Sequence, residues 1–188
     1  MNKFDLIKKE ILDILPKSLL DFELMHAELV LKWTIQLKPN ADEALQIAAL
    51  SHDVERAITG ITEKDLEDYS KINEFKKEHS IRSANIIAKI LQKHDYSQNI
   101  IEKVKKLVEN HEFGGDTESD ILKDADSLAY FDYNIPSYLK RNGRERAKAK
   151  IQFMYNRLSD NAKPLINQIK FSDKEIENLV KEALAEIK

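Results

Sequence analysis

The sequence contains no cysteine, which excludes disulfide bonds, thiolate zinc sites and cysteine nucleophiles. No run of about 18 apolar residues occurs, so we expect no transmembrane helix. The charged start, MNKFDLIKKEILDIL, lacks the pattern of a signal peptide. The formal net charge is only -3, which does not imply a strongly basic surface, so nucleic acid is not the expected partner. We therefore expect a cytoplasmic protein that does not associate with membranes.

Glycine and proline are also scarce, with four of each among 188 residues, and they separate stretches in which apolar residues recur every three or four positions. No convincing two-residue alternation of polar and apolar residues interrupts this pattern. It predicts an all-α fold of about eight helices in a single domain, residues 1–188. The expected helices span 3–14, 18–37, 41–58, 73–93, 98–112, 118–133, 137–158 and 173–187, with short ones at 62–68 and 161–169.

Two of these helices have recognisable start signals. Asn40 with Glu43 resembles a capping box, and Ser172 with Glu175 has the same spacing.

Several histidines and aspartates occupy helix faces that are otherwise apolar. In LQIAALSHDVERAI, His52 shares a face with Leu45 and Ala49, and Asp53 follows directly. Four more residues have the same placement on four further predicted helices: His26, His79, His111 and Asp126.

A single inward-facing histidine is more often a hydrogen-bonded core residue than a metal ligand. Here four of the five histidines face inward, together with two aspartates. A buried carboxylate is costly unless it is paired or binds a metal. Imidazole and carboxylate are the ligands that Zn, Mn, Fe or Co sites use when thiolates are absent. The pattern therefore predicts a metal site.

A second His-Asp pair, His94-Asp95, provides a comparison. It falls at the end of the predicted helix 73–93, where an imidazole can stabilise the helix C-terminus and an aspartate favours the following turn. We do not expect this pair to bind a metal, because the helical context carries the signal rather than the dipeptide.

The order of these residues resembles the HD-domain superfamily of metal-dependent phosphohydrolases, whose signature is H…HD…D on a helical core. The segments AALSHDVER, KKEHSIRSANIIAKIL and ILKDADSLAY are similar to segments of HD domains. The resemblance covers roughly residues 20–132. Residues 135–188 match no motif and are expected to form a C-terminal helical extension.

The resemblance implies a metal centre with one or two divalent ions (Fe, Mn, Zn, Co, Ni or Mg). Four residues are the implied ligands of one ion: His26, His52, Asp53 and Asp126. Two more are the implied ligands of a second ion, with Asp53 bridging the pair: His79 and His111. The alternative role for these two is to orient a ligand or to contact the substrate. Asp124 is the alternative to Asp126, or an acceptor that orients a ligand.

The implied activity is hydrolysis of a nucleotide or another small phosphate ester by metal-activated water. Asp126 or Asp124 would accept the proton from that water. Three cations are candidates for binding the substrate phosphate: Arg56, Arg82 and Lys123. Arg56 and Arg82 follow Asp53 and His79 by three residues. A surface salt bridge is the alternative role for each cation. The basic run KRNGRERAKAK, residues 140–150, is either a solvated helix face or a surface that attracts polyphosphate.

Other functions are compatible with the same pattern. HD-type di-iron oxygenases use the same ligand order, and a metal-binding module without turnover would also need it. The last predicted helix is amphipathic and could pack in the core or at a homodimer contact.

Overall fold

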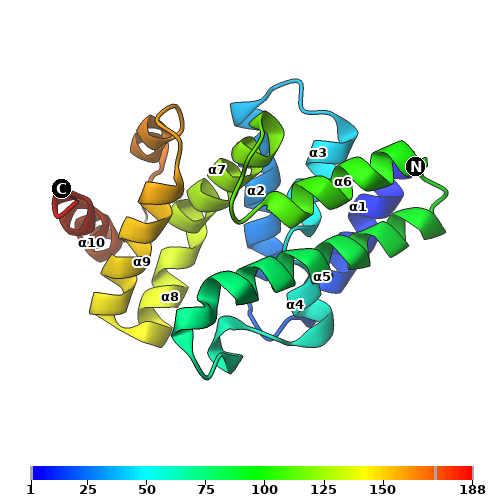
Figure 1. Ribbon diagram of the computed structural model, residues 1–188. Coiled ribbons are helices and arrows are strands. Elements are labelled where there is room, and N and C mark those ends of the chain that lie inside the picture. Colours follow the sequence, from blue (N-terminus) through cyan, green and yellow to red (C-terminus); the bar gives the residue numbers. More distant parts are fainter. Residues whose placement is uncertain (1, 172, 188) are drawn as a thin grey trace.

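The structure is a computed structural model that describes residues 2–171 and 173–187 (Figure 1). Within these residues the chain forms ten α-helices and no strand, which confirms an all-α single domain. The helices are α1 (Lys3–Ile14), α2 (Glu23–Leu37), α3 (Glu43–Ser51), α4 (Val54–Thr59), α5 (Ile72–Lys93), α6 (Gln98–Asn110), α7 (Thr117–Ala129), α8 (Ile135–Asn142), α9 (Arg144–Arg157) and α10 (Lys174–Ala185).

Shorter helical turns connect these helices. The 3-10 turns span Leu15–Lys17, Glu63–Asp65, Tyr69–Lys71 and Lys163–Gln168, and a π turn spans Tyr130–Asn134. None of the helices in the described part of the chain has both the length and the apolar character that crossing a bilayer requires.

Three predicted helices differ from the observed ones. The segment 41–58 is not one helix, because α3 and α4 are separated by a turn at His52 and Asp53. The segment 137–158 is divided at Gly143, whose φ of +78° is readily adopted only by glycine. The segment 18–37 is helical only from Glu23, after a 3-10 turn that contains Pro16.

The predicted capping residues are also corrected. The carboxylate of Asp42, rather than Asn40, begins α3 by accepting a hydrogen bond from the Leu45 backbone nitrogen at 3.0 Å. A separation of three residues in the sequence is usual between a capping side chain and the backbone nitrogen that donates to it. Ser172 lies outside the described residues, and Asp173 accepts from the Glu175 nitrogen at 2.7 Å at the start of α10.

The helices pack so that the predicted site residues approach one another. α2 packs against α3 and α7, α3 also contacts α6, and the long α5 lies along α6 (Figure 1). The largest fully buried side chains of these helices include Leu45, Leu50, Ile87, Leu91, Leu122 and Leu128. α9 packs against α7 on one side and α10 on the other, so the C-terminal helices join the same body. This packing brings α9 within reach of the residues on α7.

Candidate metal centre

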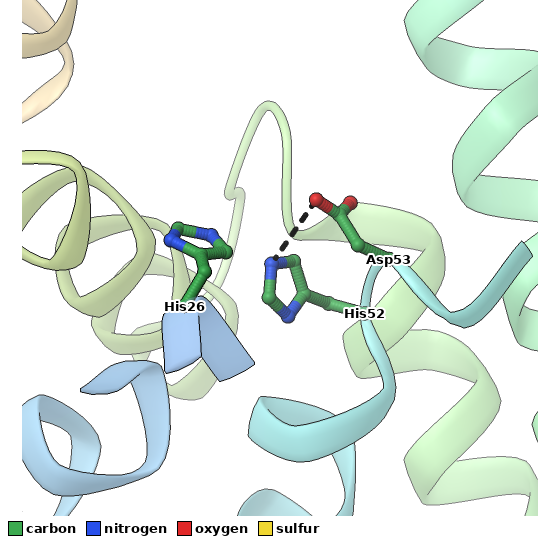
Figure 2. A group of neighbouring side chains, drawn as sticks. All are labelled: His26, His52 and Asp53. Atoms are coloured by element: carbon green, nitrogen blue, oxygen red, sulfur yellow. Dashed lines mark ion pairs between the residues drawn. The ribbon is translucent and has the colours of Figure 1, made fainter. Parts of the chain in front are cut away.

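His52 and Asp53 occupy the turn between α3 and α4 (Figure 2). In a continuous helix, consecutive side chains point about 100° apart. The turn allows both side chains to face the same buried cluster, towards which the His26 ring projects from α2. The Nε2 atom of His52 lies 3.6 Å from Asp53 Oδ2. The interruption of the predicted helix therefore places both members of the pair in the site.

The four buried histidines share one arrangement, in which Nδ1 has a hydrogen-bond acceptor. The acceptors are Asn134 Oδ1 for His26 (3.2 Å), the Ala49 carbonyl for His52 (3.0 Å), Glu55 Oε2 for His79 (2.8 Å) and the Val108 carbonyl for His111 (2.7 Å). When Nδ1–H donates to these groups, the opposite nitrogen, Nε2, carries the lone pair that binds a metal.

Each of the four Nε2 atoms faces an aspartate. The nearest carboxylate oxygens are Asp126 Oδ1 for His26 (3.1 Å), Asp53 Oδ2 for His52 (3.6 Å), Asp53 Oδ1 for His79 (2.8 Å) and Asp53 Oδ1 for His111 (3.6 Å). Neighbouring rings lie close together, with centroids 5.1 Å apart for His52 and His111. Four side chains from separate segments thus converge on two carboxylates.

Two overlapping triads in the described residues could hold metal ions. One is His26, His52 and Asp53, and the other is Asp53, His79 and His111. Within each triad the ligand atoms lie within 4.8 Å of one another, and all of these residues are buried. Asp53 belongs to both triads. Asp126 lies beside the first triad, with Oδ1 at 3.1 Å from His26 Nε2 and 4.0 Å from His52 Nε2.

The residues present fit a divalent metal ion. The Nε2 atom of His52 is buried and has no hydrogen-bond partner among the described residues. A buried polar atom without a partner is destabilising, and such atoms in native proteins often belong to functional sites. A cation bound by imidazole and carboxylate would satisfy this nitrogen and the carboxylate oxygens together. The nitrogen and oxygen donors suit Zn, Mn, Fe or Co.

Charged neighbours keep both central carboxylates ionised. Burial by itself would raise the pKa of Asp53, but the Arg56 guanidinium bonded to Oδ2 holds that pKa well below its usual range. Burial also acts on Asp126, and Arg157 holds its pKa well below the usual range through a 2.8 Å contact to Oδ2. Asp126 therefore pairs with Arg157 through Oδ2 and faces His26 through Oδ1. Asp53 Oδ1 faces His79 and His111, whereas its Oδ2 pairs with Arg56 and also lies nearest His52.

The histidines differ in their tendency to protonate. Burial lowers the pKa of His111 to about 4 and also lowers the pKa of His52. Burial acts in the same direction on His26 and His79, but the nearby aspartates and glutamates outweigh it and raise both pKa values. His52 and His111 are thus neutral near pH 7, which is the form that binds a metal.

The structure brings only some of the predicted substrate-binding residues to this centre. Arg56 touches Asp53 and lies 3.4 Å from Glu23 Oε1. Arg82 reaches the centre only through Glu55, because its Nε donates to Glu55 Oε1 at 2.6 Å. Lys123 pairs instead with Asp120 at 3.2 Å.

Asp124 has a different position from Asp126. Its two oxygens accept from the backbone nitrogen and the hydroxyl of Ser159, at 2.8 and 2.5 Å. Asp124 therefore anchors the segment after α9, whereas Asp126 points towards the histidines.

Two buried neighbours of the candidate centre could have been found with the spacing that identified Arg56 and Arg82. Glu23 and Lys76 stand one helical turn before His26 and His79, on the same helix faces. Both are buried. Burial raises the pKa of Glu23 to about 7, even though Arg56 opposes that shift.

Other neighbours come close only through tertiary packing. Arg157 of α9 binds Asp126, and Asn134 reaches His26 from the π turn. Glu112 follows His111 and accepts from Lys76 Nζ at 2.9 Å. Burial opposes ionisation of Glu112, yet Arg157 and Lys76 lower its pKa to about 2.

The pair His94-Asp95 lies at the end of α5, as its sequence context indicates. His94 Nε2 is 2.6 Å from Glu10 Oε2 of α1, and Asp95 has a φ of +54° in the turn that follows. Neither residue belongs to the two triads.

Comparisons with known proteins place this all-α chain and its buried His/Asp cluster in a family. Residues 8–180 match the family described as Domain of unknown function (DUF4202), and the chain therefore belongs to that family. No curated protein and no solved structure is a match for the chain.

Proposed function

We propose that this protein is a metal-dependent phosphohydrolase with an HD-type metal centre. The observation that carries the proposal is the convergence of four histidine Nε2 atoms on two ionised aspartates, with Asp53 shared by two triads. The order of these residues along the chain is also the order that resembles the HD signature.

The ligand roles follow from the two triads. His26, His52, Asp53 and Asp126 would hold one ion, and His79, His111 and Asp53 would hold a second. When bound, divalent ions supply a water molecule of lowered pKa and stabilise charge on phosphoryl oxygens. In hydrolysis the water oxygen joins phosphorus, and the bond from phosphorus to the leaving oxygen breaks.

Arg56 and Asp126 have the further roles in this proposal. The Arg56 guanidinium lies beside Asp53, and its planar fork can bind two phosphate oxygens at once. Asp126 is ionised and can accept the proton released by the attacking water. The substrate would be a nucleotide or another small phosphate ester.

The test compares two matched substitutions, Asp53→Asn in the centre and Asp95→Asn in the second His-Asp pair. Metal content is measured by elemental analysis, and phosphate release is measured from nucleotides and p-nitrophenyl phosphate after loading with Mn, Co, Fe, Zn, Ni or Mg. We expect about two equivalents of metal per chain if both triads are filled. Metal-stimulated phosphate release should also occur, and Asp53→Asn should lose both properties while Asp95→Asn keeps them.

Other results would replace the proposal. Oxygen uptake by the iron-loaded protein without phosphate release would indicate a di-iron oxygenase. Tight metal binding with neither reaction would indicate a binding module. If metal content were the same in both variants, the assigned ligands would be wrong.

A further inference from the structure

Basic side chains gather around the ring of Phe153 in α9. The Lys76 Nζ lies 4.5 Å from the ring centroid, the Lys150 Nζ lies at 5.2 Å and the Arg157 guanidinium carbon lies at 5.9 Å. The Phe153 side chain is 44% exposed, so this group reaches the surface. We call these four residues, Phe153, Lys76, Lys150 and Arg157, the basic group.

The basic group adjoins the metal centre through two contacts. One terminal nitrogen of Arg157 donates a hydrogen bond to Asp126 Oδ2 at 2.8 Å, and the other terminal nitrogen lies 3.4 Å from Glu112 Oε2. The other oxygen of Glu112 is 4.0 Å from His111 Nε2. Arg157 therefore belongs to the basic group and also contacts the residues of the candidate metal centre.

Positive charge in the basic group exceeds the negative charge that it contacts. Lys76 and Arg157 share the Glu112 carboxylate, and Arg157 also pairs with Asp126. Lys150 forms no ion pair or hydrogen bond with any residue in the ranges 2–171 and 173–187. Burial lowers the pKa of Lys150 although the charge of Glu63 acts in the opposite direction, and this is the effect expected of an ammonium group that no carboxylate contacts. An anion bound beside Phe153 would compensate this charge.

Two other basic residues of the run 140–150 are already paired with carboxylates of α10. Arg144 pairs with Glu182, and Lys148 pairs with Glu182 at 3.0 Å and Glu186 at 2.6 Å. Lys150 differs from these two residues, because its ammonium group lies at the Phe153 ring and not against α10.

We propose that Lys150, with Lys76 and Arg157, binds a second phosphate of the substrate, next to the one held at the metal centre. The preferred substrate class is then a phosphoanhydride, with two or more linked phosphates, rather than a monoester. The assignment of a substrate rests on the proposed function, whereas binding of an anion to the basic group does not.

The test uses inorganic pyrophosphate and the full chain, stripped of metal and dialysed free of chelator. Binding is measured by calorimetry for the unsubstituted protein and for Lys150→Gln and Lys148→Gln. Lys148→Gln is the matched control, because Lys148 lies on the same helix and its substitution removes the same charge at a position away from Phe153. Lys150 is the informative position because its loss leaves no buried carboxylate without a partner. We expect Lys150→Gln to weaken binding about tenfold, the effect of one charge-assisted hydrogen bond. Lys148→Gln should change it less than about twofold.

The results separate this proposal from the proposed function. Equal weakening in both variants, or no binding of pyrophosphate at all, would overturn the anion site whatever the enzyme activity. Pyrophosphate binding that depends on Lys150 would support the site even if the metal-loaded protein released no phosphate. In an active enzyme, Lys150→Gln should raise KM for nucleoside triphosphates about tenfold and leave KM for p-nitrophenyl phosphate unchanged. The same increase for both substrates would refute the assignment of a second phosphate.

Discussion

At the scale of single residues, Glu55 holds a proposed ligand in place. Its buried carboxylate accepts from His79 Nδ1 at 2.8 Å, from Arg82 Nε at 2.6 Å and from Thr59 Oγ1 at 2.8 Å. This network fixes the His79 ring with Nε2 towards Asp53. Because the partner of a ligating histidine orients the ring and raises its basicity, we expect Glu55→Gln to weaken metal affinity at least about tenfold.

A competition titration with a chromophoric chelator would measure this effect. Glu78→Gln is a suitable control, since Glu78 is exposed and lies 3.7 Å from the same Arg82. Unchanged affinity in Glu55→Gln would mean that His79 does not bind metal through Nε2.

Arg157 provides a second prediction at this scale. It is mostly buried and neutralises Asp126 in the metal-free protein. Its replacement by Gln leaves a buried carboxylate without its cation, which should cost about 3–5 kcal/mol of unfolding free energy. A metal ion next to Asp126 would supply positive charge, so we expect a smaller loss in the metal-loaded protein.

Urea unfolding of the metal-free and metal-loaded forms measures both values. Arg144→Gln is the control on the same helix, where an exposed ion pair with Glu182 contributes about 1 kcal/mol or less. An Arg157→Gln loss that metal did not reduce would argue against an ion beside Asp126.

At the scale of elements, the start of α7 determines where Asp126 lies. Asp116 caps this helix by accepting from the Ser119 backbone nitrogen at 3.0 Å, and it pairs with Lys106 at 2.9 Å. The backbone hydrogen bond, followed by Lys106, lowers the pKa of Asp116 to about 2. Because the folded pKa lies below the unfolded value, the charge stabilises the protein above about pH 4. That contribution is lost as the pH falls towards about 2.

Comparison of Asp116→Asn with the unsubstituted protein isolates this contribution, because asparagine retains the capping oxygen without the charge. The unsubstituted protein should have the larger unfolding free energy at pH 6, and the difference should shrink towards zero at pH 2. A difference that did not depend on pH would contradict the assigned pKa. Asp116→Ala should lose about 1 kcal/mol more, since it also removes the cap.

The sequence predicted elements well where periodicity was continuous and poorly where the site interrupts it. α1, α5 and α6 begin within a residue of their predicted starts, because the apolar spacing near these starts is not interrupted by a turn. The turn at His52-Asp53 was missed because its residues continue the helical spacing. The π turn Tyr130–Asn134 was not predicted, because the sequence pattern indicated a break between helices 118–133 and 137–158, whereas the π turn joins α7 to α8 without one. Such turns often occur at functional sites.

Contacts between residues that are far apart in the sequence could not be predicted, for a different reason. The inward-facing histidines could be recognised from their own helices, because a polar residue on an apolar stripe is a local signal. The contact of Arg157 with Asp126 joins residues 31 positions apart, and it depends on how α9 packs against α7. The apolar periodicity within one helix contains no information about how two helices pack against each other.

At the scale of the whole molecule, the candidate metal centre joins segments that are distant in sequence. Its residues come from α2, the α3–α4 turn, α5, the end of α6 and α7, and α9 closes it through Arg157. A ligand bound only by the folded chain stabilises that state by about 2.7 kcal/mol at a free concentration one hundred times its Kd. We therefore expect the metal-loaded protein to have a higher Tm than the metal-free protein.

Differential scanning calorimetry at several metal concentrations measures this shift, which should grow with the logarithm of the free metal. Asp53→Asn should abolish the shift, because Asp53 belongs to both triads, and Asp95→Asn should retain it. Metal-free Asp53→Asn need not be less stable than the metal-free parent, because the substitution also removes a buried charge from among the histidines. The difference between loaded and unloaded forms is thus the decisive quantity. If metal bound to the protein without raising Tm, it would have to bind outside the buried cluster, and the centre would owe its six polar residues to hydrogen bonding alone.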